Sequence, residues 1–151
     1  MRQMKIATIV SALSLWAVPV FAHVGVTPRE SKPGATETYT LRVPSEGGRT
    51  TTSVTLEVPE GVAVLSVSAP DGAKHEEKRE GDRIVTITWT IEIKAGASAQ
   101  LSFVAKNPAQ GDSIAWKVHQ HYADGTVSDW VGPAGSRNPA PVTRLVATHV
   151  H

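Results

Sequence analysis

The stretch RIVTITWTIEI, residues 83–93, decides the fold class of this chain. From Val85 to Ile93 every second residue is apolar, and the residues between them are mostly threonine or charged. A period of two is typical of a β-strand with one face buried and the other facing solvent. We therefore expect a long strand here, with Trp89 pointing into a core.

Similar runs lie on both sides of this stretch, and turn signals separate them. The other expected extended segments are residues 24–28, 37–43, 51–58, 62–67, 74–80, 101–105, 114–122, 127–131 and 139–147. Many of the 12 glycines and 10 prolines lie between the runs, and Asp124-Gly125 is a hairpin signal. About nine short strands at intervals of about 8 to 12 residues predict an all-β sandwich. The inward face of 114–122 includes Trp116, which we also expect in the core.

The N-terminal segment has the pattern of a signal peptide. Arg2 and Lys5 precede an uncharged run, residues 6–20, and small residues stand at Val20 and Ala22. This pattern predicts a leader over residues 1–22, cleaved after Ala22. The alternative is a membrane anchor, but the run of about 15 residues is shorter than the roughly 20 that a spanning helix needs. No later segment is apolar enough to span, so we expect a periplasmic or secreted protein.

Composition excludes several classes of function. The 15 Lys and Arg include Arg2 and Lys5, which leaves 13 against 14 Asp and Glu after cleavage, with no basic run to bind nucleic acid. Cysteine is absent, and both methionines precede the cleavage site. The mature domain therefore has no sulfur ligand for a Cu(I) site or a blue-copper centre.

Cleavage after Ala22 makes His23 the first residue. An N-terminal histidine offers a metal ion its α-amino nitrogen and an imidazole nitrogen, a chelating pair that an internal histidine cannot form. Two nitrogen donors suit Cu(II), which favours tetragonal sites of nitrogen and oxygen. The alternative is that His23 is a solvated chain end.

Four short motifs occur in a fixed order: His23-Val24, RVPSE at residues 42–46, Asp124-Gly125 and Asp129-Trp130. With these motifs the chain resembles the YcnI-like copper-binding domain family of exported bacterial proteins, over the mature chain to about Leu145. The resemblance implies an immunoglobulin- or cupredoxin-like sandwich over residues 23–147, followed by a short tail, 148–151.

The resemblance also implies a single Cu(II) site of the kind called a mono-histidine brace. Its ligands would be the amino group and imidazole of His23 and the carboxylate of Glu46, with the indole of Trp130 beside the metal. Taken without the resemblance, Glu46 reads as a solvated loop carboxylate and Trp130 equally well as a packing residue.

The other histidines leave two further possibilities open. His119 and His121 lie two residues apart on one strand, which is compatible with a second metal site or with a solvated face. His149 and His151 end the chain and either hold metal weakly or have no role.

Three functions are compatible with these features. The first is a non-enzymatic Cu(II)-binding protein that buffers copper or passes it to another periplasmic or membrane copper protein. The second is a copper-dependent oxidase or monooxygenase, which would need a second histidine near His23. The third is a metal-free interaction module, for which β-sandwiches are common hosts.

Overall fold

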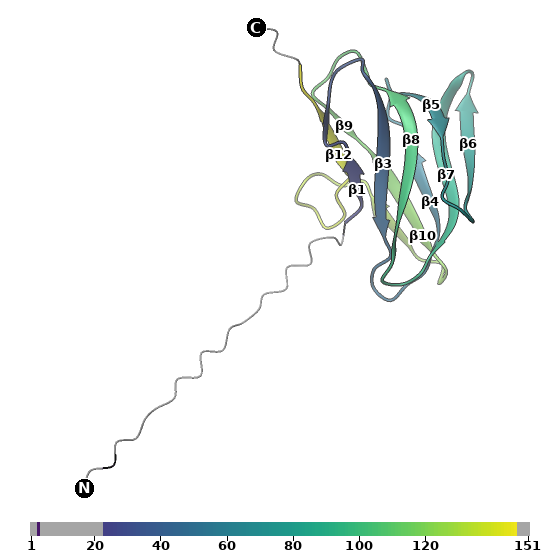
Figure 1. Ribbon diagram of the computed structural model, residues 1–151, viewed down its shortest axis with the longest axis vertical. Helices are drawn as coiled ribbons and strands as arrows, with labels where there is room; N and C mark the ends of the chain where they lie inside the picture. The colour runs from purple at the N-terminus through teal and green to yellow at the C-terminus, as the bar shows by residue number, and fades with distance from the viewer. Residues whose placement is uncertain (1–2, 4–22, 148–151) are drawn as a thin grey trace.

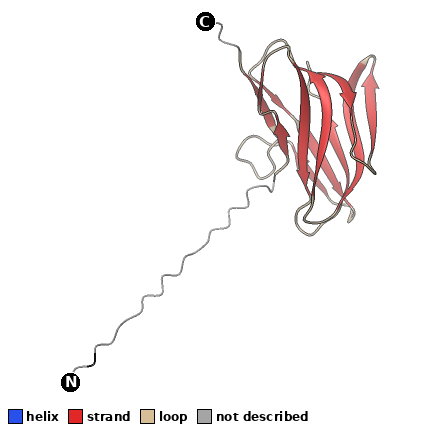
Figure 2. Ribbon diagram, in the orientation of Figure 1, coloured by secondary structure: helices blue, strands red, loops and turns tan. Residues whose placement is uncertain are grey.

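β-strands and turns, without any helix, make up the part of the chain that this computed structural model describes, which is residue 3 and residues 23–147. Figure 2 shows this all-strand architecture. The predicted signal peptide, apart from residue 3, and the tail at 148–151 lie outside the described residues. Within the described part, no helix is long and apolar enough to cross a membrane.

Twelve strands form three sheets in the described residues (Figure 1). They are β1 (Gly25–Thr27), β2 (Glu30–Ser31), β3 (Thr36–Pro44), β4 (Thr51–Glu57), β5 (Ala63–Val67), β6 (Lys74–Glu80), β7 (Arg83–Ile93), β8 (Ser98–Lys106), β9 (Ser113–Ala115), β10 (Lys117–Tyr122), β11 (Val127–Trp130) and β12 (Val142–Leu145). One sheet has the order β1-β3-β8-β5, the second β11-β10-β4-β7-β6, and a small third sheet β2-β12-β9. The predicted all-β sandwich is confirmed.

The core lies between the two larger sheets and is built from the inward residues of the alternating runs. Trp89 and Trp116 are fully buried, as their positions in the alternation predict. Trp116 packs against Tyr39 with ring centroids 4.7 Å apart and against Phe103 at 5.4 Å. Both indole N–H groups find acceptors: that of Trp89 donates to the Ser68 carbonyl at 2.9 Å, and that of Trp116 to the Thr143 hydroxyl at 3.1 Å.

The segment expected as one strand over 114–122 is divided in two at Trp116. Before Trp116, β9 pairs with β12 in the small sheet, and after it β10 pairs with β4 and β11 in the second large sheet. The backbone N–H of Trp116 donates to the Pro141 carbonyl at 2.8 Å, outside either ladder. This break and the two-residue strand β2 raise the number of strands in the described residues to twelve, from the ten extended segments expected.

Strand register brings the beginning of β1 beside the end of β3. The two strands run antiparallel, with Gly25 opposite Arg42 and Thr27 opposite Thr40. In an antiparallel pair, a step back along one strand corresponds to a step forward along its partner. His23 comes two residues before Gly25, so it lies toward Pro44, which comes two residues after Arg42. Glu46 follows two residues after Pro44. The register therefore brings two of the predicted site residues to one end of the first sheet.

Candidate metal centre

His23 lies at the edge of the sandwich, just before β1, and its side chain is exposed. Its imidazole faces the indole of Trp130, with ring centroids 5.7 Å apart and an interplanar angle of 57°. β1 and β11 are edge strands of the two large sheets. The contact between His23 and Trp130 thus joins the two sheets along one side of the sandwich.

Glu46 lies in the loop between β3 and β4 and is exposed. The next two residues, Gly47 and Gly48, have φ values of 71° and 69°, a left-handed conformation that glycine adopts without steric cost. This pair of glycines turns the chain immediately after Glu46. Within the described residues, the Glu46 carboxylate has no hydrogen bond or ion pair, so both oxygens are available to a ligand.

The residue before Glu46 anchors this loop. Ser45 is fully buried, and its hydroxyl donates to the Arg49 carbonyl at 2.6 Å and lies 2.8 Å from the Thr51 hydroxyl. Its backbone is held as well, because the N–H of Ser45 donates to Ala97 O and its carbonyl accepts from Gly96 N, each at 2.8 Å. Glu46 therefore projects from a fixed point of the backbone although its own side chain is free.

A buried glutamine connects Trp130 to this loop. Trp130 is 7% exposed, and its indole N–H donates to Oε1 of Gln120 at 3.0 Å. The amide nitrogen of Gln120 donates to the Pro44 carbonyl at 2.9 Å and to the Thr51 hydroxyl at 2.8 Å. Gln120 is 0% exposed, so the orientation of the indole and the end of β3 are set by the same side chain.

A polar pocket of about 370 Å³ contains two of the three predicted site residues. Its lining residues are Pro44, Glu46, Arg49, Tyr122, Ser128, Trp130, Arg137 and Asn138. His23 adjoins it through the ring contact with Trp130. The structure therefore places His23 against Trp130, and places Glu46 in the pocket that Trp130 lines.

Side chains alone offer few metal ligands anywhere in the described part of the chain. No group of three or more His, Cys, Asp or Glu side chains there is placed to hold a metal ion. At the candidate centre the side-chain donors are His23 and Glu46. A third donor would have to be a main-chain group. The α-amino group of His23, which the predicted cleavage after Ala22 would create, is such a donor.

His119 and His121 lie on the outer face of β10, and His119 is held between two carboxylates. Its Nδ1 lies 2.5 Å from an oxygen of Asp129 on β11, and its Nε2 lies 3.0 Å from an oxygen of Glu57 on β4. Both ring nitrogens thus have carboxylate partners on neighbouring strands. This arrangement favours a network of ion pairs across the sheet over a second metal site. The other open pair, His149 and His151, lies outside the described residues.

The surroundings of His119 shift its pKa. Partial burial of the ring lowers the pKa of His119, but the hydrogen bonds and negative charges of Asp129 and Glu57 outweigh this, so the pKa lies above its ordinary value. A histidine whose pKa is raised by folding stabilises the fold fully below its unfolded pKa of about 6.5. That stabilisation is lost as the pH rises through the folded pKa.

We expect His119→Asn to destabilise the protein more at about pH 6 than at about pH 8.5, because only the protonated ring gains from the two carboxylates. The difference should stay below about 1 kcal/mol, since solvent screens exposed pairs of this kind. Urea denaturation at a series of pH values measures it. His121→Asn, on the same face of β10, is the matched control. A destabilisation by His119→Asn that grows with pH would contradict the assignment.

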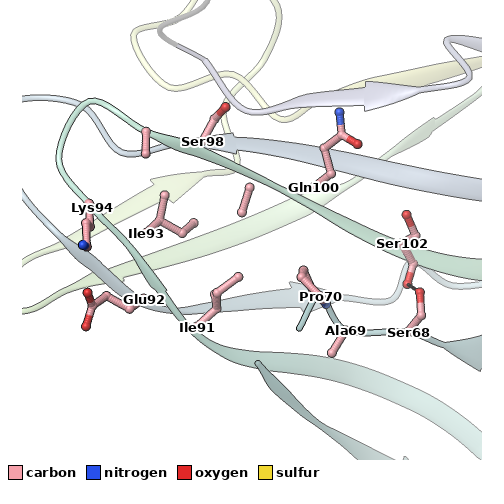
Figure 3. Close-up of a pocket in the computed structure, with 12 residues that line it drawn as sticks. Ser68, Ala69, Pro70, Ile91, Glu92, Ile93, Lys94, Ser98, Gln100 and Ser102 are labelled. Atoms are coloured by element: carbon pink, nitrogen blue, oxygen red, sulfur yellow. Dashed lines mark hydrogen bonds between the residues drawn. The ribbon is translucent and has the colours of Figure 1, made fainter. Parts of the chain in front are cut away.

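A larger groove, of about 700 Å³, lies between β7 and β8 (Figure 3). Ile91 and Ile93 line it from β7, and Ser98 and Gln100 line it from β8. None of the three predicted site residues is among its lining residues. The polar pocket beside Trp130, although smaller, is therefore the one that contains the candidate ligands.

Three residues around the candidate centre were not predicted from the sequence: Gln120, Arg49 and Arg137. Gln120 could have been found from the sequence, because an amide side chain stands there among the inward-facing, otherwise hydrophobic residues Ile114, Trp116, Val118 and Tyr122. A polar side chain at a core position requires a hydrogen-bond partner. The two arginines could not have been found in this way, because each lies in a loop between strands, where the sequence has no alternating pattern.

Comparison with known proteins identifies the family. A family model described as "Domain of unknown function (DUF1775)" matches residues 23–145. The chain belongs to this DUF1775 family. The copper-binding protein CutI of Bacillus subtilis (strain 168) is 36% identical over 142 residues, which cover 92% of this chain and 70% of CutI. The expected relationship to the YcnI-like family is confirmed.

Solved structures support the fold of this DUF1775 domain. An uncharacterised protein from Nocardia farcinica, described as having an immunoglobulin-like fold, superposes with a TM-score of 0.72 and 24% identity, over 83% of this chain and 99% of that one. A putative membrane anchored protein from Corynebacterium diphtheriae superposes with a TM-score of 0.50 and 8% identity, over 83% of this chain and 35% of that one. The likeness to the Nocardia farcinica protein supports an immunoglobulin-like architecture.

Proposed function

We propose that this protein is exported, loses residues 1–22, and then binds one Cu(II) ion through the amino group and imidazole of His23 and the carboxylate of Glu46. In this proposal the indole of Trp130 lies beside the metal. The observations that carry the proposal are the contact of His23 with the indole of Trp130 and the presence of the unpaired Glu46 in the pocket that this indole lines. The name of the relative CutI, a copper-binding protein, supports the choice of metal.

The donor set suits Cu(II). Two nitrogen donors and one carboxylate oxygen are the ligand types of tetragonal Cu(II) sites. The imidazole of His23 is exposed and Glu46 has no competing partner among the described residues, so neither must break an interaction to bind. Gln120 holds Trp130 and the end of β3 in place. This favours metal binding, because groups that are already ordered lose less conformational entropy when the ion binds.

The protein's role follows from the kind of site. A brace with a single histidine and a carboxylate, on the exposed edge of a rigid sandwich, can take up and release an ion without rearranging the core. We therefore propose that the protein buffers copper in the periplasm or outside the cell, or passes it to another copper protein, without catalysing a reaction itself.

Two forms of the protein test the proposal: one that begins at His23 with a free amino group, and the same chain with that α-amino group acetylated. Acetylation converts the α-amino nitrogen of His23 into an amide and supplies no new amine to anchor the metal. We expect Cu(II) titration, followed by tryptophan fluorescence and electron paramagnetic resonance, to show affinity at least about 100-fold higher for the form with the free amino group. Equal affinities would place copper elsewhere, for instance at His119 and His121.

A further inference from the structure

The pocket beside Trp130 contains more positive than negative charge. Glu46 is the only carboxylate among its lining residues, whereas Arg49 and Arg137 both line it. Neither arginine forms an ion pair with Glu46. A carboxylate and two guanidinium groups thus share one cavity of about 370 Å³ without forming an ion pair with one another.

The two arginines differ in how they are held. The guanidinium of Arg49 lies over the ring of Tyr122, 3.8 Å from its centroid, and donates to the Thr126 hydroxyl at 3.1 Å. Arg137 is exposed and has no hydrogen bond or ion pair with the described residues. Its donors are therefore open to a ligand, whereas those of Arg49 are partly committed.

Arg137 is nevertheless kept beside the site, because its loop is closed on the residues that follow Trp130. The N–H of Gly132 donates to the Asn138 carbonyl at 3.0 Å, and the N–H of Ala140 donates back to the Gly132 carbonyl at 2.9 Å. A side chain at Gly132 would collide with Ser136, whose hydroxyl oxygen would lie 2.3 Å from the added Cβ. The loop therefore returns Arg137 and Asn138 to the pocket that contains Trp130.

We propose that this pocket binds a small carboxylate anion next to the copper ion, held by Arg137 with the help of Arg49. This inference rests on the proposed function. With neutral donors from His23, a bound Cu(II) adds two positive charges to a pocket that already has a surplus of one. An anion at Arg137 would offset that charge, and a carboxylate would also supply oxygen, a donor type that Cu(II) accepts.

The chemistry of the pocket selects a carboxylate. The planar fork of a guanidinium matches the two oxygens of a carboxylate, and oxygen is a ligand that Cu(II) accepts together with nitrogen. A cavity of about 370 Å³ is at the lower end of the range for small-ligand sites. The anion and the copper ion should then strengthen each other's binding, because coupling between two ligands is reciprocal.

The competing explanation is that Arg137 acts as an internal counter-ion for Glu46 in solution and has to move away when copper binds. The two explanations predict different effects of Arg137→Gln. Removal of a counter-ion raises copper affinity by the same factor in every buffer. Loss of an anion site lowers copper affinity only where a carboxylate is present.

The test measures Cu(II) affinity of the form that begins at His23 in acetate and in perchlorate at equal ionic strength, after correction for the weak complex of copper with free acetate. We expect acetate to raise the affinity about five- to tenfold, the low end of typical coupling between sites, and to change the paramagnetic resonance spectrum. Arg137→Gln should lose both effects. Arg144→Gln, whose arginine pairs with Glu30 at 3.2 Å on the small sheet, should retain them.

Three outcomes would overturn the inference. They are tight copper binding that is indifferent to acetate, an acetate effect that survives Arg137→Gln, and a uniform gain of affinity in Arg137→Gln. In all three the copper site of the proposed function stands. Failure to bind copper in either buffer would instead overturn the proposed function and this inference together.

Discussion

We expect Glu46→Gln to lower the Cu(II) affinity of the form that begins at His23 by at least about 100-fold, because loss of a group that only supports a metal ligand already costs about 10- to 100-fold. The substitution keeps the size of the side chain and removes the charge. Glu46 is exposed and has no partner in the described residues. Removal of its charge therefore breaks no interaction that stabilises the folded, metal-free protein. Thermal unfolding of the metal-free protein should therefore be unchanged.

Glu60→Gln is the control for the loss of one negative charge. Glu60 is exposed and follows the end of β4, whereas Glu46 precedes its beginning, so the two glutamates lie at opposite ends of that strand. Fluorescence titration of both variants with Cu(II) makes the comparison. Similar affinities for the two would show that Glu46 acts through general charge, and the proposed brace would lose its oxygen ligand.

The largest effect on stability is expected from Gln120→Leu. Gln120 is fully buried and makes three hydrogen bonds, to the indole N–H of Trp130, the Pro44 carbonyl and the Thr51 hydroxyl. Leucine is of similar size, so the loss comes from polar groups left without partners and not from a cavity. Each buried group that is left unpaired costs about 1–3 kcal/mol. We expect a decrease of about 3–4 kcal/mol in the free energy of unfolding, measured in denaturant without copper.

A double-variant cycle separates the contribution of the indole. In a Trp130→Phe background the N–H is absent, so Gln120→Leu should cost about 1 kcal/mol less than it does in the native protein. Gln110→Leu, at an exposed loop position, should change stability by less than about 0.5 kcal/mol. A cost for Gln120→Leu as small as that of the control would mean that the buried network contributes little to the fold.

Much of the fold was predictable from local pattern. Alternation with period two identified the strand over residues 83–93 and placed Trp89 and Trp116 in the core, where both are fully buried. The pattern could not show that the run 114–122 changes sheets at Trp116. An alternating strand has the same sequence signature whichever neighbour it pairs with, because the pattern reports which face is buried.

The expected strand over residues 62–67 is present as β5, but its apolar side chains are less buried than those of the central strands. The apolar run 62–67 contains β5, whose residue Leu65 is 59% exposed. Only Val62, just before the strand, is buried in this run. Apolar composition by itself does not place a strand inside the sandwich, since β5 is an edge strand that pairs only with β8.

By itself, the sequence determined that the chain forms a β-sandwich and that His23, Glu46 and Trp130 are the candidate copper residues, the last two through a family resemblance. Only the tertiary structure brought these residues to one place, through the register of β1 on β3 and the contact of His23 with Trp130 across the two sheets. It also revealed Gln120 as the link between Trp130 and the end of β3, and Arg137 in the pocket that Glu46 and Trp130 line. The physical reason is that alternation is a local property, whereas strand pairing joins residues far apart in the chain. A site made where two sheets meet therefore appears only when every strand has found its partner.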